Sequence, residues 1–170
     1  MKGLFIVVIL PLLLIAGCGY HFPGRDGGTL AGYGESITIP IFANKTPKAN
    51  LEILLANELL DEFYRKSGVK VLDNGGGDLH LDGAITSYGT SAVSYSASDT
   101  VKEYRATMAV EAVLKSNRDG KVIWKGTVSR SQDFPANIDI ALQRNSEDAA
   151  IREILGKVAQ ELYLKISEDF

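Results

Sequence analysis

Histidine and cysteine, two residue types that often carry out catalysis or bind metal ions, are rare in the sequence, and no pair of carboxylates stands out from the ordinary surface charge. The 170 residues include two histidines, His21 and His80, and a single cysteine, Cys18. Neither histidine has a partner ligand at the spacing of a zinc site. The hydroxyl-rich stretch 87–100 contains no Gly-x-Ser-x-Gly motif of the kind that exposes a nucleophilic serine. The sequence therefore predicts no enzyme activity, no metal site and no cofactor.

The chemistry that the sequence does indicate is lipidation of Cys18. The preceding residues 15–17, Ile-Ala-Gly, resemble a lipobox, in which small side chains let signal peptidase II reach the bond before the cysteine. Lys2 and the apolar run 4–15 stand in the order of a secretory signal. That run is shorter than the roughly 20 residues of a membrane-spanning helix. We expect cleavage of residues 1–17 and acyl chains on Cys18 that hold the protein in a membrane.

Two alternatives for this segment are a transmembrane anchor and a buried cysteine behind an ordinary signal. A lone cysteine in an exported protein has no internal disulfide partner, so lipidation accounts for it better. The residue after Cys18 is Gly19, and lipoproteins that stay in the inner membrane tend to have aspartate there, so the outer membrane is favoured. The net charge of −3 does not favour nucleic-acid binding.

The rest of the chain reads as a tether followed by one domain. Residues 18–35 are rich in glycine and predict a flexible, lipid-anchored tether. Residues 36–41 alternate and predict a strand. A helix is expected to open at Thr46 and Pro47, with Glu62 on its polar face. Because residues 69–72 predict a second strand, the two strands should run parallel.

Three more strands are expected at 79–86, 104–115 and 121–128, each with one buried face. Residues 131–144 are expected to be irregular or partly helical, and the last helix is expected to begin at Asn145 or Ser146. The predicted fold class is α+β, a two-layer sandwich over 36–170. It has a mixed four-stranded sheet with two helices packed on one face.

Residues 87–100, here called the finger, join two strands and contain no charged side chain except Asp99. Strand character continues into both of its ends, so the two arms should be longer than usual and project beyond the helices that cover the sheet. One interpretation is a solvated hairpin end. The other is an element that inserts into the polar interior of an outer-membrane β-barrel. In that case the side chains that contact the barrel should be as follows: Tyr88, Ser94, Tyr95 and Ser96.

Four segments give the chain a family resemblance. They are residues 18–22 (Cys-Gly-Tyr-His-Phe), 36–40 (Ser-Ile-Thr-Ile-Pro), 103–105 (Glu-Tyr-Arg) and 141–147 (Ala-Leu-Gln-Arg-Asn-Ser-Glu). In these segments and in element order, the chain resembles the LptE family of lipopolysaccharide-assembly lipoproteins.

The resemblance implies a function and a location. An LptE-like protein would plug the LptD β-barrel, assist its assembly and take part in placing lipopolysaccharide in the outer membrane. It would be lipid-anchored on the periplasmic side. Family members bind lipopolysaccharide through basic residues near the hairpin tip and ahead of the last helix. Arg144 matches the second position, and Lys102 and Arg105 are the expected substitutes for the first. The alternative function is a general lipid-tethered periplasmic binding module or chaperone.

Overall fold

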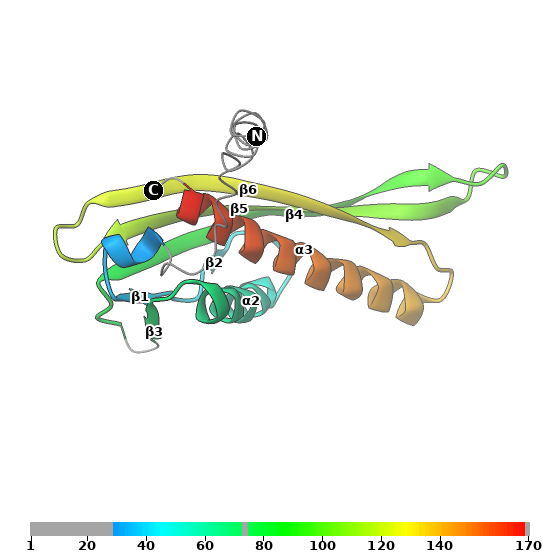
Figure 1. Cartoon of the computed structure of the whole chain (residues 1–170). Coiled ribbons are helices and arrows are strands. Elements are labelled where there is room, and N and C mark those ends of the chain that lie inside the picture. Colours follow the sequence, from blue (N-terminus) through cyan, green and yellow to red (C-terminus); the bar gives the residue numbers. More distant parts are fainter. Residues whose placement is uncertain (1–28, 73–74, 169–170) are drawn as a thin grey trace, which may run out of the picture.

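The computed structural model describes residues 29–72 and 75–168 (Figure 1). The expected signal peptide, Cys18 and most of the expected tether lie outside these residues. The described domain begins earlier than the expected start at Ser36. Residues Thr29–Gly32 form a short 3-10 helix, η1, whose Leu30 side chain is buried against the core.

The described residues form one mixed sheet of six strands, so the predicted mixed character is correct and the predicted count of four was wrong. The strands are β1 (Ser36–Thr38), β2 (Ala43–Asn44), β3 (Lys70–Leu72), β4 (Leu79–Tyr95), β5 (Val101–Ser116) and β6 (Val122–Pro135). Their order is β3-β1-β4-β5-β6, and β2 also pairs with β4. The sequence pattern missed β2 because two residues cannot show an alternation.

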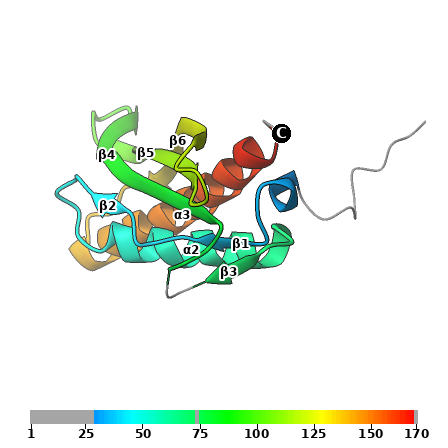
Figure 2. The same ribbon diagram turned by 90° about the vertical axis from the view of Figure 1, so that its left-hand side faces the viewer.

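The sheet has a parallel part and an antiparallel part. β1 pairs in parallel with β3, as expected from the strand, helix and strand order, and both β1 and β2 pair in parallel with β4. β4, β5 and β6 form a long antiparallel meander. Helices α2 (Leu51–Lys66) and α3 (Ile140–Glu168) lie side by side on one face of the sheet (Figures 1 and 2). The two-layer α+β arrangement is therefore confirmed.

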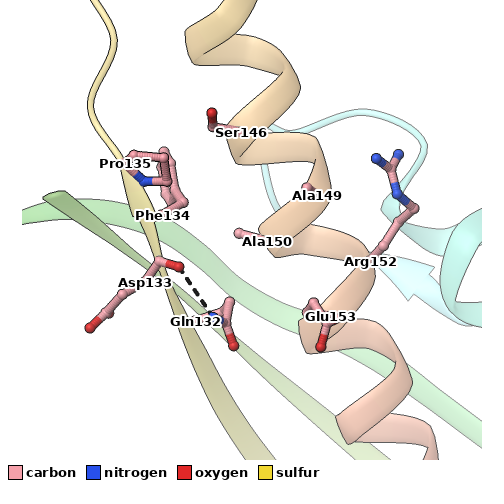
Figure 3. A pocket seen from close by; sticks show the side chains of 9 residues that line it. All are labelled: Gln132, Asp133, Phe134, Pro135, Ser146, Ala149, Ala150, Arg152 and Glu153. Carbon is pink, nitrogen blue, oxygen red and sulfur yellow. Dashed lines mark hydrogen bonds between the residues drawn. The ribbon is translucent and has the colours of Figure 1, made fainter.

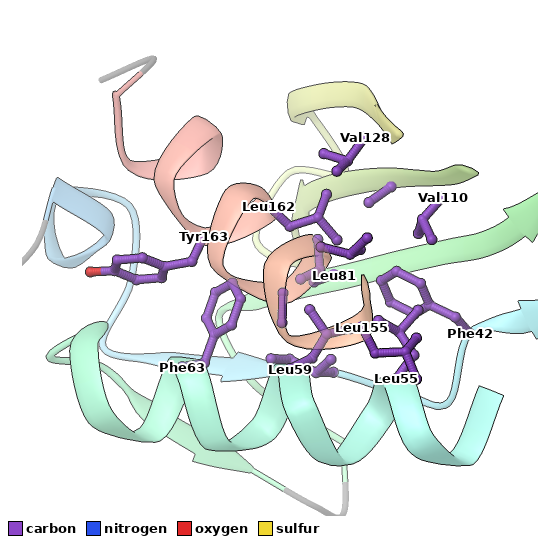
Figure 4. Packing of buried hydrophobic residues seen from close by; sticks show 14 of the residues in the cluster. Phe42, Leu55, Leu59, Phe63, Leu81, Val110, Val128, Leu155, Leu162 and Tyr163 are labelled. Carbon is purple, nitrogen blue, oxygen red and sulfur yellow. The ribbon is translucent and has the colours of Figure 1, made fainter. Parts of the chain in front are cut away.

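The core lies between the helices and the sheet (Figure 4). Its strand members alternate as predicted, with Leu81 of β4 and Val110 of β5 fully buried. From the helices, Leu59 and Leu162 are also fully buried, and Phe63 packs edge-on against Tyr163 with ring centroids 5.4 Å apart. Each such side chain contributes roughly 1.5–3 kcal/mol of burial, which fixes the helices on the sheet.

The start of α2 differs from the prediction. The helix begins at Leu51, after Asn50 in a left-handed conformation (φ 67°), and not at Pro47. The Thr46 hydroxyl does not cap the helix, because it donates a hydrogen bond to the Asn44 side chain at 2.8 Å. The Asn44 amide in turn donates to the Lys48 carbonyl and to the Glu52 carboxylate. Asn44 thus holds residues 44–52 in a turn before the helix.

Glu62 is buried rather than exposed on the polar face of α2, while Ile53, expected in the buried stripe, is half exposed. The Glu62 carboxylate lies 2.6 Å from the Lys66 ammonium and 3.0 Å from the Arg65 guanidinium. These cations are one turn further along the helix, where i,i+3 and i,i+4 pairs meet. A buried carboxylate requires such partners, which the local pattern alone did not reveal.

The end of β6 and the start of α3 were also predicted wrongly. β6 continues to Pro135, and α3 begins at Ile140, ahead of Asn145 and Ser146. The carboxylate of Asp139 accepts hydrogen bonds from the amides of Ala141 and Leu142 at 2.7 and 3.1 Å, which is the geometry of an N-cap. The first turn of α3 contributes no buried side chain to the core, so no helical stripe marked it in the sequence.

Candidate functional site

The hairpin of β4 and β5 extends well past the helices, as the sequence predicted (Figure 1). The two strands stay paired as far as Tyr95 and Val101. From Gly89 to the turn, no side chain is fully buried, and Tyr95 is 58% exposed. The structure therefore presents the distal part of the finger as a free, ordered element.

Ser96 builds the turn at the tip of the finger. Its hydroxyl accepts hydrogen bonds from the amides of Ser98 and Thr100 at 3.2 and 3.1 Å, and its own amide donates to the Thr100 carbonyl at 2.8 Å. Asp99 takes a left-handed conformation (φ 57°) that the turn requires. Of the expected contact residues at the tip, Ser94 and Tyr95 thus lie on the strand arm. The hydroxyl of the third, Ser96, forms hydrogen bonds within the turn.

Tyr88 fastens the base of the finger to α3. Its hydroxyl donates a hydrogen bond to Glu147 at 2.7 Å, and the Lys48 ammonium contacts the same carboxylate oxygen at 2.8 Å. Burial raises the pKa of Tyr88, and the neighbouring Glu147 carboxylate raises it further. Desolvation opposes ionisation of Glu147, but Lys48 and Tyr88 together hold its pKa below the usual value. The Tyr88 hydroxyl thus makes a contact within the domain, and the expected contact of Tyr88 with a barrel stays a prediction.

Arg105 is paired inside the sheet. Its guanidinium makes two hydrogen bonds to Asp133 on β6, at 2.6 and 2.8 Å. This bidentate contact lowers the pKa of the Asp133 carboxyl. In the described domain Arg105 is therefore paired with Asp133, and its expected contact with lipopolysaccharide stays a prediction.

Lys102 and Arg144 are exposed, and neither makes an ion pair with another residue of the described chain. They lie at the same end of the domain. The Lys102 carbonyl accepts a hydrogen bond from the Ala136 amide at 2.8 Å, which joins the start of β5 to the connection before α3. Arg144 is in the second turn of that helix.

Three apolar side chains stand exposed beside these cations. Ile138, Ile140 and Leu142 are 101%, 71% and 54% exposed. A hollow of about 340 Å³ lies between this segment and the hairpin arm, and its lining includes Tyr104 and Gln143. This cluster was not predicted, although three aliphatic residues in an otherwise polar stretch of the sequence could have indicated an exposed apolar surface. Unpaired cations next to exposed apolar side chains suit an amphiphilic, anionic ligand.

A comparison with protein-family models settles the family. The model described as LptE, lipopolysaccharide-assembly, matches residues 34–166. The chain belongs to the LptE family. A comparison with curated proteins finds no match.

Solved structures share the fold of this LptE-family chain. Rare lipoprotein B from Shewanella oneidensis is 17% identical with a TM-score of 0.54, over 78% of this chain and 94% of that one. Lipoprotein B from Nitrosomonas europaea is 14% identical with a TM-score of 0.56, over 79% and 83%. A protein from Xanthomonas campestris is 14% identical with a TM-score of 0.60, over 80% and 85%. At these identities the likeness concerns the fold alone.

A second hollow of the LptE-family domain lies between the end of β6 and α3 (Figure 3). Its volume is about 400 Å³, and small side chains of α3, among them Ser146 and Ala150, leave it open. The Gln132 amide spans part of it by donating to the Asp133 carbonyl at 3.2 Å, and Arg152 points away from it. The hollow therefore offers no cation to a phosphate, unlike the cluster around Arg144.

Two further findings concern the described residues of this family member. They contain no group of three histidine, cysteine or acidic side chains placed to hold a metal ion. No helix among them is both long and apolar enough to cross a membrane.

Proposed function

We propose that this LptE-family protein plugs an LptD-type outer-membrane β-barrel, assists its assembly and takes part in lipopolysaccharide transport and insertion. The observation that carries the proposal is the finger. On a domain of this family, an ordered hairpin extends past the helices, and from Gly89 to Ser98 it has no charged side chain. The role is that of an assembly partner and not of an enzyme.

The chemistry of the finger suits a barrel interior. That interior is polar, so hydroxyl side chains such as Ser94 can exchange hydrogen bonds with the wall. An uncharged element also enters a confined space without desolvating an unpaired charge, which would be costly. The contact of Tyr88 with Glu147 holds the base of the finger in one orientation, so less entropy is lost on docking.

The cluster at the start of α3 suits lipopolysaccharide. Arg144 and Lys102 can pair with phosphate groups, the guanidinium in bidentate fashion. Ile138 and Ile140 can contact acyl chains, which bury best against aliphatic side chains. Because Arg105 is held by Asp133, it has no part in this proposal.

The proposed anchoring rests on the sequence. Residues 1–17 would be removed, Cys18 would carry the acyl chains, and the part of the expected tether that precedes η1 would hold the domain on the periplasmic side of the outer membrane. One acyl chain binds a membrane marginally and several bind it durably, so a fully acylated Cys18 would keep the domain beside its barrel.

Site-specific photo-crosslinking in cells tests the docking face. A crosslinker at Ser94 should capture one barrel protein, because this position lies on the finger that is proposed to enter the barrel. Ser94 does not form the turn, so replacing it should leave the tip of the finger intact. The control is Asn57, an exposed position on α2. Strong capture at Asn57 with none at Ser94 would reject the proposed orientation, and capture of many clients at Ser94 would favour the chaperone alternative.

A further inference from the structure

The outer edge of β4 loses its neighbours halfway along the strand. β1 pairs only with Leu79 and His80, and β2 only with Ala84 and Ile85. Beyond Ile85, no strand of the described residues lies on that side, although β5 accompanies β4 to Tyr95 on the other. The distal half of β4 is therefore an edge strand whose outward main-chain groups have no strand partner.

The last contact on this edge shows which main-chain groups point outward. The Ile85 carbonyl accepts a hydrogen bond from the Lys45 amide at 3.0 Å, so Ile85 directs its main chain away from β5. Opposite Ile85 on β5 is Val110. In an antiparallel sheet alternate residues of a middle strand bond to opposite neighbours, so Val110 directs its main chain to β6.

A register shift after Ile85 interrupts the alternation on β4, but β5 pairs with β6 without a break from Val110 to Tyr104, so the alternation can be followed on β5. Thr90 lies opposite Ala106, and Ala92 lies opposite Tyr104. Both β5 residues are an even number of positions from Val110, so they too bond to β6. It follows that Thr90 and Ala92 direct their N–H and C=O groups to the free edge, while Ser91, between them, bonds to β5.

This edge lacks the charged side chains and prolines that keep many sheet edges from pairing, although its register with β5 shifts between Ala92 and Ser94 and again between Ser94 and Tyr95. Between Gly89 and Tyr95 there is no lysine, no other charged residue and no proline. β6, the far edge of the same sheet, has several of these residues: Lys125, Arg130, Asp133 and Pro135. Charged side chains and proline are the usual protection of an exposed edge, and their absence from one edge marks it as a site of strand addition.

We propose that the β4 edge from Gly89 to Tyr95 binds an extended, uncharged segment of the partner barrel protein as an added strand. The inference rests on the proposed function and specifies how the partner is held. Inside a barrel lumen the outward amides and carbonyls of Thr90 and Ala92 would lose water, and buried main-chain groups need hydrogen-bond partners. The barrel strands are already paired with each other, so the added strand is a loop or plug segment of that protein.

Proline scanning of the edge tests the proposal. Thr90→Pro removes an outward N–H and puts a ring in the path of an added strand, yet it takes no hydrogen bond from β5. Thr90→Val is the matched control, because it loses the same hydroxyl and keeps the N–H. The full-length lipoprotein is co-expressed with the barrel protein, and the barrel recovered per lipoprotein is measured. We expect at least about a tenfold loss for Thr90→Pro and little change for Thr90→Val.

Amide hydrogen exchange gives an independent readout in the unmutated complex. The amides of Thr90 and Ala92 should exchange rapidly in the isolated protein and become protected when the barrel is bound. Those of Gly89 and Ser91, which face β5, should be protected in both states. Protection that does not change at Thr90 and Ala92 would overturn the inference.

The outcomes separate this inference from the proposed function. If no barrel copurifies even with the parent protein, the proposed function fails first. If the barrel copurifies equally with the parent and with Thr90→Pro, the barrel partnership stands and strand addition is wrong. A dimer of the isolated protein that Thr90→Pro dissociates would show that the edge pairs with a second copy, which also overturns the inference.

Discussion

At the scale of single residues, the structure distinguishes two cations that are close together in the sequence, because one is paired and the other is not. Arg105 and Lys102 both lie on the hairpin arm, but Arg105 is held by Asp133 and Lys102 is not. The partner of Arg105 is on another strand, and only the register of β5 with β6 reveals it. Sequence reasoning named both residues as candidates and could not rank them.

Arg144→Glu should weaken lipopolysaccharide binding by the purified protein with little change in stability. The reason is loss of a guanidinium that is unpaired in the domain and replacement by a charge that repels phosphate. Arg152→Glu is the control, because Arg152 is an exposed cation further along the same helix. Lys102→Glu should act in the same direction and more weakly. Equal loss for Arg152→Glu would mean that binding reflects net charge only.

Glu147→Gln should reduce stability at neutral pH and flatten its acid dependence. The pKa of Glu147 is lowered in the folded state, so its contribution is complete above the unfolded value near 4.5 and is lost as pH falls through the folded pKa. Urea unfolding should show a deficit of about 1 kcal/mol near neutral pH that disappears in acid. A deficit that stays constant over this range would assign it to packing and not to the ionised carboxylate.

At the scale of elements, long alternating strands were predictable and helix ends were not. The buried faces of β4 and β5 follow from period-two patterns over many residues. The start of α3 does not, because its first residues, such as Ile140, are largely exposed and add no buried side chain to the core. Similarly, the Thr46-Pro47 signal was misleading because Asn44 binds the Thr46 hydroxyl that would otherwise cap a helix.

Asp139→Ala should destabilise the domain by about 1 kcal/mol, the usual value of an N-cap. Asn145→Ala should have almost no effect, since α3 has already begun and Asn145 is exposed. Thermal unfolding of the two variants side by side gives the comparison. The reverse ranking would place the start of the helix where the sequence alone suggested.

At the scale of the whole molecule, a finger projects from an α+β domain, and we propose a lipid anchor ahead of that domain. The sequence predicted the α+β class, both helices on one face and the projection of the hairpin. It did not predict that Tyr88 ties the finger to α3 through Glu147, a contact between residues 59 positions apart. Such contacts depend on how the layers pack, which local periodicity does not encode.

Cys18→Ser should release the domain from the membrane fraction. Without a thiol no thioether-linked acyl chain forms, and the hydrophobic contribution of the chains to membrane binding is lost. Metabolic labelling with palmitate, followed by fractionation, measures both effects. Label that persists in the variant would reject Cys18 as the acylated residue.

The central claim, that the finger enters a partner barrel, is tested most directly by one charge placed on it. Tyr95 and Tyr64 are the same residue type and are both 58% exposed, one on the finger and one on α2. Each is changed to aspartate, and the barrel that copurifies is measured alongside the thermal unfolding of each isolated domain. Tyr95→Asp should lose most of the barrel while Tyr64→Asp retains it, with both domains folded, because an unpaired charge is costly only where docking desolvates it. Full recovery with Tyr95→Asp together with loss for Tyr64→Asp would contradict the account.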